Sequence, residues 1–212
     1  MTDSPDTEEP PRSTRERFHW DWHRRTEPGA ELLGDLSGQV VAELAANRPG
    51  QASVLARMWA PARIVVVGPR HVPRQRRRRA GEARTHPETV RFDPERYLRR
   101  HPGCFDVVYS VFGPLGRVDP DILLPRIAAA LKPGGLLAFS TLAPAATGAG
   151  PLRRRTAVRG GGSQHRALAV DRWHQLLGAH GFDTAATDTI HDPGDGSGQP
   201  GVVTNVFRTV RR

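Results

Sequence analysis

Two histidines close to the N-terminus have the spacing of groups that can act together in metal binding or catalysis. His19 and His23 are four positions apart, which places two side chains on one face of a helix. A metal site needs at least a third ligand, and none stands nearby in the sequence, so no metal is expected. A histidine also suits a general base, as does Tyr109 in a later apolar run. The residue types do not choose among these three proton acceptors, so the catalytic residues stay unassigned.

A cluster of arginines between Arg70 and Arg79 concentrates positive charge in one stretch. The chain has 31 lysines and arginines against 22 aspartates and glutamates, which gives a net charge of +9. A basic patch can bind RNA or another anion. No RNA-reading motif accompanies the cluster, so a solvated face is the preferred interpretation, and an anion or RNA site is the alternative.

Length and composition indicate one globular domain. The chain has 212 residues, 37% of them hydrophobic, and no apolar run long enough to span a membrane. Residues 1–15 are polar and are predicted to form a disordered tail before a domain over 16–212. The tail lacks the basic start and apolar middle of a signal peptide, so a cytoplasmic protein is expected. The single cysteine, Cys104, excludes an internal disulfide and is expected to be a buried thiol.

Short apolar runs alternate with segments of helical periodicity, and this rhythm predicts a parallel sheet covered on both faces. Two closing strands joined by a loop predict an antiparallel edge. The run 63–67 (RIVVV) has no polar alternation, as expected of a strand buried on both faces. Strands are predicted at 39–44, 63–67, 90–92, 105–112, 136–141, 182–189 and 202–210, and helices at 31–36, 51–59, 93–100, 119–131 and 171–180.

Aspartate followed by proline marks two helix starts. Asp93 and Asp119 are predicted N-caps, each with proline at the first helical position. Pro125 is expected to break or kink the second of these helices. The segment 132–135 (KPGG) is expected to be a turn before the next strand.

The second half of the chain resembles class I S-adenosylmethionine-dependent methyltransferases. The resemblance rests on FDVVYSVFG (105–113), then Asp119-Pro120, then LKPGGLLAFS (131–140). It implies an α/β fold with a Rossmann-like doubly wound, mostly parallel seven-stranded sheet and an antiparallel edge strand. The aromatic segment FHWDW (18–22) is similar to a segment that closes over the cofactor in small-molecule members, and Trp20 is its predicted cofactor contact.

The same resemblance implies where S-adenosylmethionine would bind. In the family a glycine-rich turn after the first strand lets the backbone approach the methionine and ribose. An acid after the second strand takes the ribose hydroxyls, an acid after the third takes the adenine amino group, and a wall of side chains follows the fourth. The turn after the first strand corresponds here to Glu43, Ala45, Ala46 and Asn47. The ribose acid corresponds to Gly68, the adenine acid to Asp93, and the wall to Ser110 and Phe112.

The cofactor positions depart from the family pattern more than the fold positions do. The family's three loop glycines are replaced by Ala45, Asn47 and Pro49, and the ribose acid by Gly68. Asparagine tolerates positive φ, whereas proline fixes φ and donates no hydrogen bond. Asp93 keeps the spacing of the adenine acid and also fits a helix N-cap.

Three functions remain open at this point. The first is S-adenosylmethionine-dependent methyl transfer to a small-molecule acceptor. The second is a catalytically inactive relative kept as a binding or scaffolding protein, which the altered loop favours. The third is an anion or RNA binder that uses the cluster from Arg70 to Arg79.

Overall fold

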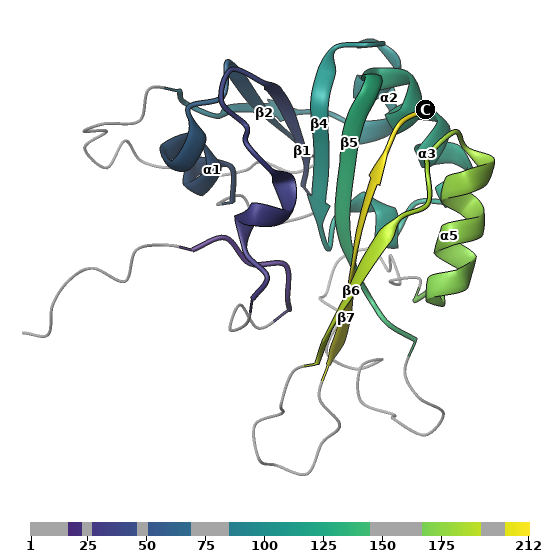
Figure 1. Cartoon of the computed structure of the whole chain (residues 1–212). Coiled ribbons are helices and arrows are strands. Elements are labelled where there is room, and N and C mark those ends of the chain that lie inside the picture. Colours follow the sequence, from purple (N-terminus) through teal and green to yellow (C-terminus); the bar gives the residue numbers. More distant parts are fainter. Residues whose placement is uncertain (1–16, 23–26, 46–50, 69–84, 145–166, 192–201) are drawn as a thin grey trace, which may run out of the picture.

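The computed structural model describes residues 17–22, 27–45, 51–68, 85–144, 167–191 and 202–212 (Figure 1). The predicted tail over 1–15, the arginine cluster from Arg70 to Arg79, and His23 lie outside the described residues. None of the helices within the described ranges has the length and hydropathy needed to span a bilayer.

Within the described residues, seven strands form one sheet in the order β3-β2-β1-β4-β5-β7-β6. β1 to β5 pair in parallel, and β7 runs antiparallel to both β5 and β6. The Rossmann-like, mostly parallel sheet with an antiparallel pair at one edge is thereby confirmed, and the reversed strand is β7. The strands are β1 (Val40–Leu44), β2 (Arg63–Gly68), β3 (Glu88–Arg91), β4 (Phe105–Val111), β5 (Leu131–Leu142), β6 (Ala186–His191) and β7 (Val203–Val210).

Helices cover both faces of the sheet (Figure 1). One face packs against α1 (Gln51–Trp59), the 3-10 turn η1 (Ala30–Leu33) and the segment 17–22. The other packs against α2 (Pro94–Arg99), α3 (Pro120–Ala130) and α5 (Val170–Ala179). A second 3-10 turn, η2 (Pro114–Gly116), follows β4.

The central strands are apolar without alternation because each of their two faces has its own core. In β2, Ile64 and Val66 belong to the cluster under α1, and Val65 and Val67 to the cluster under α2 and α3. All four side chains are at most 2% exposed. The expectation drawn from the RIVVV run is confirmed.

The predicted helix starts are confirmed. The side chain of Asp93 accepts a hydrogen bond from the backbone N–H of Arg96 at 3.0 Å, and Asp119 accepts one from Asp121 at 3.1 Å. Each satisfies a donor that the first helical turn would otherwise leave unpaired. α5 ends at Ala179, and two residues later Gly181 adopts φ +85°, a conformation that favours glycine and stops the helix from continuing.

Three local predictions were wrong. The break considered at Pro125 does not occur: α3 continues through this residue, because the burial of Leu123, Leu124 and Ile127 on its inner face holds the helix despite the lost N–H. The expected turn at 132–135 lies inside β5, as an irregularity where Gly134 takes φ +74°. The helix expected at 31–36 is instead the shorter η1.

Cys104 was expected to be buried and is exposed. It precedes β4, where Phe105 takes the inward-facing position with 0% exposure. The Sγ of Cys104 contacts the backbone oxygen of Pro102 at 3.4 Å. Residues 17–22 are not helical. The described residues contain no cluster of histidine, cysteine, aspartate or glutamate that could hold a metal.

Candidate functional site

The carboxyl ends of β1, β2 and β4 meet at one edge of the sheet. β1 pairs with β2 on one side and with β4 on the other, so the strand order reverses direction between β1 and β4. Open parallel sheets bind ligands in the crevice outside the carboxyl ends at such a reversal. Of the residues predicted to bind the cofactor, Glu43, Gly68 and Ser110 lie in the last residues of these three strands. Asp93 follows β3, the next strand of the sheet.

Glu43 joins β1, β4 and the start of α1 at this edge. Its side chain is buried, and Oε2 accepts a hydrogen bond from the Tyr109 hydroxyl at 2.7 Å and from the backbone N–H of Ala52 at 3.2 Å. Ala52 lies in the first turn of α1, whose N–H groups have no partner within the helix. Glu43 therefore fixes the helix start that follows the loop 46–50.

Tyr109 does not suit the role of general base. Burial, then the negative charge of Glu43 and the hydrogen bond to it, raise the pKa of the Tyr109 hydroxyl well above its usual value. The phenol therefore stays protonated and donates to Glu43. The structure thus removes Tyr109 from the three conceivable proton acceptors.

The end of β2 is closed against β1. The backbone N–H of Ala45 donates to the Val67 oxygen at 2.9 Å, which extends the ladder one residue past β1. A Cβ atom on Gly68 would lie 2.9 Å from the backbone oxygen of Ala45. The position predicted to face the ribose therefore has no room for a side chain unless the backbone shifts. Ala46 and Asn47 lie outside the described residues.

Ser110 has a structural partner at the end of β4. Its side chain is buried, and Oγ donates to the backbone oxygen of Leu44 at 2.9 Å. A Cβ atom on Gly113 would collide with Ser110 Oγ and with the Leu44 oxygen. The chain leaving β4 thus packs directly over the end of β1, and the Ser110 hydroxyl holds that packing in place of facing a ligand.

Phe112 adopts a strained backbone conformation where β4 ends. Its φ is +46°, a region that bulky side chains rarely occupy and that costs on the order of 1–3 kcal/mol. Its backbone N–H donates to the Ser140 oxygen at 3.2 Å. The Phe112 ring meets Trp22 edge to face, with ring centroids 5.2 Å apart, and Trp22 is 40% exposed. The two rings form an aromatic surface at the carboxyl edge.

Trp20 belongs to the core, so its predicted role as a cofactor contact is corrected. The side chain is 0% exposed, its Nε1 donates to the Gly29 oxygen at 2.7 Å, and its ring packs on Phe18 at 5.0 Å. No surface is left for a ligand. Trp22, from the same aromatic segment, is the residue that reaches the edge.

The side chain of Gln51 ties the N-terminal segment to α1. Gln51 Nε2 donates to the His19 backbone oxygen at 2.7 Å, and the His19 N–H donates to Gln51 Oε1 at 3.4 Å. Gln51 is the first residue of α1. Trp22, three residues after His19, contacts Phe112. The segment 19–22 therefore crosses the carboxyl edge from the start of α1 to the end of β4.

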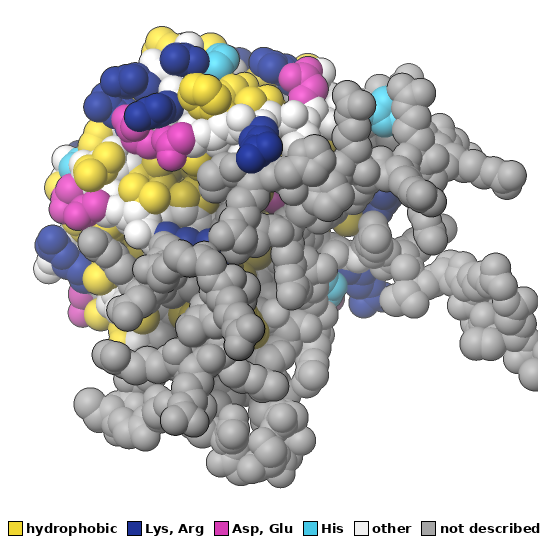
Figure 2. All heavy atoms as spheres, turned by 180° about the vertical axis from the view of Figure 1, so that it is seen from behind, with side chains coloured by type: hydrophobic (Ala, Val, Ile, Leu, Met, Phe, Trp, Pro, Cys, Tyr) yellow, Lys and Arg dark blue, Asp and Glu magenta, His cyan; other side chains and the backbone are white. Residues whose placement is uncertain are grey.

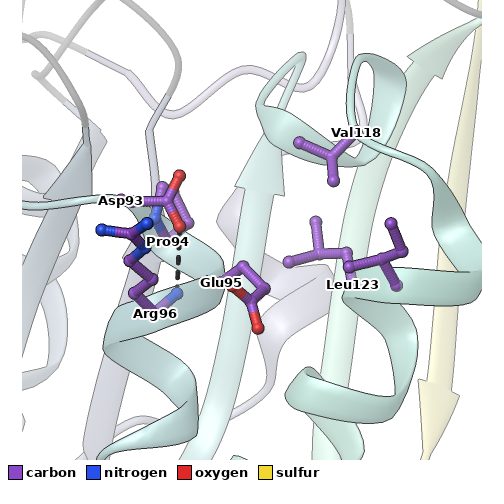
Figure 3. Close-up of a pocket in the computed structure, with 7 residues that line it drawn as sticks. Asp93, Pro94, Glu95, Arg96, Val118 and Leu123 are labelled. Carbon is purple, nitrogen blue, oxygen red and sulfur yellow. Dashed lines mark hydrogen bonds between the residues drawn. The ribbon is translucent and has the colours of Figure 1, made fainter.

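Asp93 faces a cavity of about 350 Å³ between α2 and α3 (Figure 3). One oxygen of its carboxylate caps α2, and the other has no hydrogen-bond partner among the described residues. Below it, Glu95 bridges the two helices through an ion pair of 3.1 Å with Arg126. The cavity is lined by Asp93, Pro94, Glu95, Arg96, Val118, Ile122 and Leu123.

No protein-family model matches the chain, and no curated protein matches it. Several solved structures do match this chain. One is the 1,6-didemethyltoxoflavin-N1-methyltransferase of Burkholderia thailandensis, with bound 1,6-didemethyltoxoflavin and S-adenosylhomocysteine. It is 19% identical, the match covers 82% of this chain and 72% of that one, and the TM-score is 0.58. Another is an S-adenosylmethionine-dependent methyltransferase from Mesorhizobium loti, 20% identical over 85% of this chain and 94% of that one, with a TM-score of 0.60.

This chain has the class I methyltransferase fold. The same fold also occurs in a protein named for another reaction, the [4+2]-cyclase SpnF. That structure is 15% identical over 84% of this chain and 76% of that one, with a TM-score of 0.62. At these identities the likeness establishes the methyltransferase fold, and the function has to be argued from the site.

Proposed function

We propose that the protein binds S-adenosylmethionine at the carboxyl edge of its sheet and transfers the methyl group to a small-molecule acceptor. The observation that carries the proposal is the bond of Glu43 to both Tyr109 and the first turn of α1. It fixes the start of the helix that follows residues 46–50 in the sequence, at the carboxyl edge where open parallel sheets bind ligands. The toxoflavin enzyme, which has a similar fold, was crystallised with S-adenosylhomocysteine.

The described residues fit the adenosine part of this cofactor in one place and not in another. The free oxygen of Asp93 can accept a hydrogen bond from an adenine amino group, and Val118, Ile122 and Leu123 give the cavity an apolar wall for a flat ring. At the ribose, Gly68 offers no carboxylate, and the Ala45 oxygen occupies the space that a side chain would need. A hydrogen bond to a charged group contributes about 1.5–3 kcal/mol, so binding about tenfold to a hundredfold weaker than with an acid is expected.

When bound, S-adenosylmethionine supplies a methyl group on a sulfonium sulfur. The chain's own residues position the two reactants and cover them. Trp22 and Phe112 present an aromatic surface between the start of α1 and the end of β4, against which an acceptor can pack. Positioning of this kind supplies a large share of the rate enhancement in bimolecular transfers.

A catalytically inactive relative is the second candidate, and the closed end of β2 favours it. Gly68 has no side chain to offer the ribose, and a Cβ atom at this position would lie 2.9 Å from the Ala45 oxygen. The [4+2]-cyclase is an example of this fold in a protein named for a reaction other than methyl transfer. Under this alternative the carboxyl edge would bind a different small molecule.

An anion or RNA binder has less support from the described residues. On the face shown in Figure 2, the coloured basic side chains lie among acidic and hydrophobic ones, without a large area of one sign. The arginines from Arg70 to Arg79 lie outside the described residues. A role in binding nucleic acid, like the cytoplasmic location, stays a prediction from the sequence.

Thermal unfolding with and without S-adenosylhomocysteine separates the first two candidates. A ligand at one hundred times its dissociation constant stabilises a protein by about 2.7 kcal/mol, which raises the Tm of a domain this size by roughly 5–10 °C. Adenosine triphosphate at the same concentration is the control for a nonspecific anion effect on a basic protein. Equal shifts with both compounds, or none with either, would count against the proposal.

A further inference from the structure

A histidine and an aspartate lie together in the segment that crosses the carboxyl edge. Nδ1 of His19 is 3.9 Å from Oδ1 of Asp21. The Asp21 side chain is 6% exposed and that of His19 is 20% exposed. Nδ1 of His19 is itself buried and has no hydrogen-bond partner among the described residues. The exposed fraction of the side chain therefore belongs to atoms other than Nδ1.

The backbone around His19 is held on both sides. Gln51 binds the His19 N–H and its backbone oxygen, so the residue sits against the first turn of α1, directly after the loop 46–50. Three residues on, Trp22 contacts Phe112 at the end of β4. His19 and Asp21 are thus located between the start of α1 and the end of β4, where the proposed function places the reacting groups.

Three other titratable groups near this edge have contacts or positions that fit other roles. Tyr109 donates to Glu43, and Glu43 also accepts from Ala52. Asp93 caps α2 and faces the cavity between α2 and α3. Among the described residues, His19 is the one group at the crossing segment with a nitrogen that can take up a proton and a carboxylate beside its other nitrogen.

We propose that His19 is the general base of the transfer and that Asp21 is the positioning residue that orients its ring. The inference rests on the proposed function and deepens it by naming the acceptor class, a hydroxyl, thiol or N–H group that gives up a proton as it is methylated. A carboxylate facing Nδ1 favours the tautomer with the proton on Nδ1, which leaves Nε2 with a lone pair for the acceptor. A distance of 3.9 Å is longer than a hydrogen bond, and such contacts often tighten when the reactants bind.

The step balances without a further reactant. The acceptor's heteroatom forms a bond to the methyl carbon as the carbon–sulfur bond of the sulfonium breaks, and that electron pair stays on sulfur. The acceptor's proton moves to Nε2 of His19 and is later released to water. His19 then returns to its neutral form with the proton on Nδ1.

The tautomer of His19 can be read directly by long-range ¹H–¹⁵N NMR on histidine-labelled protein at pH 8. His19→Gln assigns the signal by its loss, and His174→Gln is the matched control, because His174 lies on α5 and bonds Thr187 instead. The expected result is a proton on Nδ1 in the wild type and a shift of the proton toward Nε2 in Asp21→Asn. A proton on Nε2 in the wild type, or no change in Asp21→Asn, would overturn the proposal.

Chemical labelling tests whether Nε2 faces the proposed site. Diethyl pyrocarbonate modifies neutral histidines, and saturating S-adenosylhomocysteine is expected to slow modification of His19 about tenfold while leaving His174 unchanged. Unslowed labelling of His19 in protein that calorimetry shows to be loaded with S-adenosylhomocysteine would overturn the base assignment alone. Absence of S-adenosylhomocysteine binding would overturn the proposed function, and the base assignment with it.

Discussion

The hydroxyl of Tyr109 donates a 2.7 Å hydrogen bond to Oε2 of Glu43, between two buried side chains 66 positions apart in the sequence. The same carboxylate oxygen accepts from Ala52 at the start of α1. A single carboxylate thereby joins two neighbouring strands and the helix that follows the cofactor loop of this fold. Because a buried carboxylate without donors is costly, each of these contacts supports the others.

Removing the Tyr109 hydroxyl should destabilise the protein. Tyr109→Phe leaves the ring in place and takes one donor from a buried carboxylate, so the free energy of unfolding is expected to fall by about 1–3 kcal/mol. Urea denaturation followed by fluorescence measures the change. A loss below roughly 0.5 kcal/mol would mean that the bond to Glu43 contributes little.

The pH dependence of this effect has a definite sign. The pKa of Tyr109 is raised in the folded protein by burial and by Glu43, above the value of about 10 expected in the unfolded chain. Below pH 10 both states keep the proton and the stabilisation is complete. Above pH 10 only the unfolded state releases the proton, so the wild type loses stability and approaches Tyr109→Phe. A difference between the two proteins that stays constant from pH 8 to pH 11 would contradict this account.

A side chain at Gly68 should not restore a ribose contact. Both Gly68→Ala and Gly68→Asp place a Cβ atom 2.9 Å from the Ala45 oxygen, and each is expected to cost about 1–3 kcal/mol of stability. The alanine variant is the control that separates the steric cost from the effect of the carboxylate. Calorimetry should find S-adenosylhomocysteine bound by Gly68→Asp no more tightly than by the wild type. Tenfold tighter binding would show that the end of β2 can open.

Two variants of Asp93 separate its roles as helix cap and adenine contact. Asn caps a helix about as well as Asp, so Asp93→Asn should keep the stability of α2, whereas Asp93→Ala should lose about 1 kcal/mol. Both should weaken S-adenosylhomocysteine binding by about tenfold, because neither offers a free carboxylate oxygen to the adenine amino group. Wild-type affinity in Asp93→Asn would restrict Asp93 to the structural role.

The fold was largely predictable because its signals are local. The apolar runs of β1, β2 and β4 and the helix start at Asp93 are each determined by a few adjacent residues. The errors occur where tertiary packing decides. The buried face of α3 outweighs Pro125, and the inward position of Phe105 leaves Cys104 exposed. A single sequence does not carry that information.

The site was less predictable, because it depends on which residues face one another across the sheet. The sequence places two tryptophans in one short segment, and only the structure shows that Trp20 is buried while Trp22 reaches Phe112. From the sequence, Gly68 stands where the family has an acidic residue. The structure shows in addition that the backbone oxygen of Ala45 lies where a side chain on Gly68 would begin. The bond between Glu43 and Tyr109 follows from the pairing register of β1 with β4, in which the two residues are direct partners. The predicted roles of Ala46 and Asn47 lie outside the described residues.

Isothermal titration of the purified protein with S-adenosylmethionine and S-adenosylhomocysteine tests the central claim most directly. The proposed site predicts one molecule bound per chain, with a dissociation constant at or below tens of micromolar even without an acid at Gly68, which corresponds to roughly 6–7 kcal/mol of binding free energy. Absence of heat, together with absence of thermal stabilisation at millimolar concentrations of either compound, would contradict the claim. The methyltransferase fold would then serve another function at the same edge.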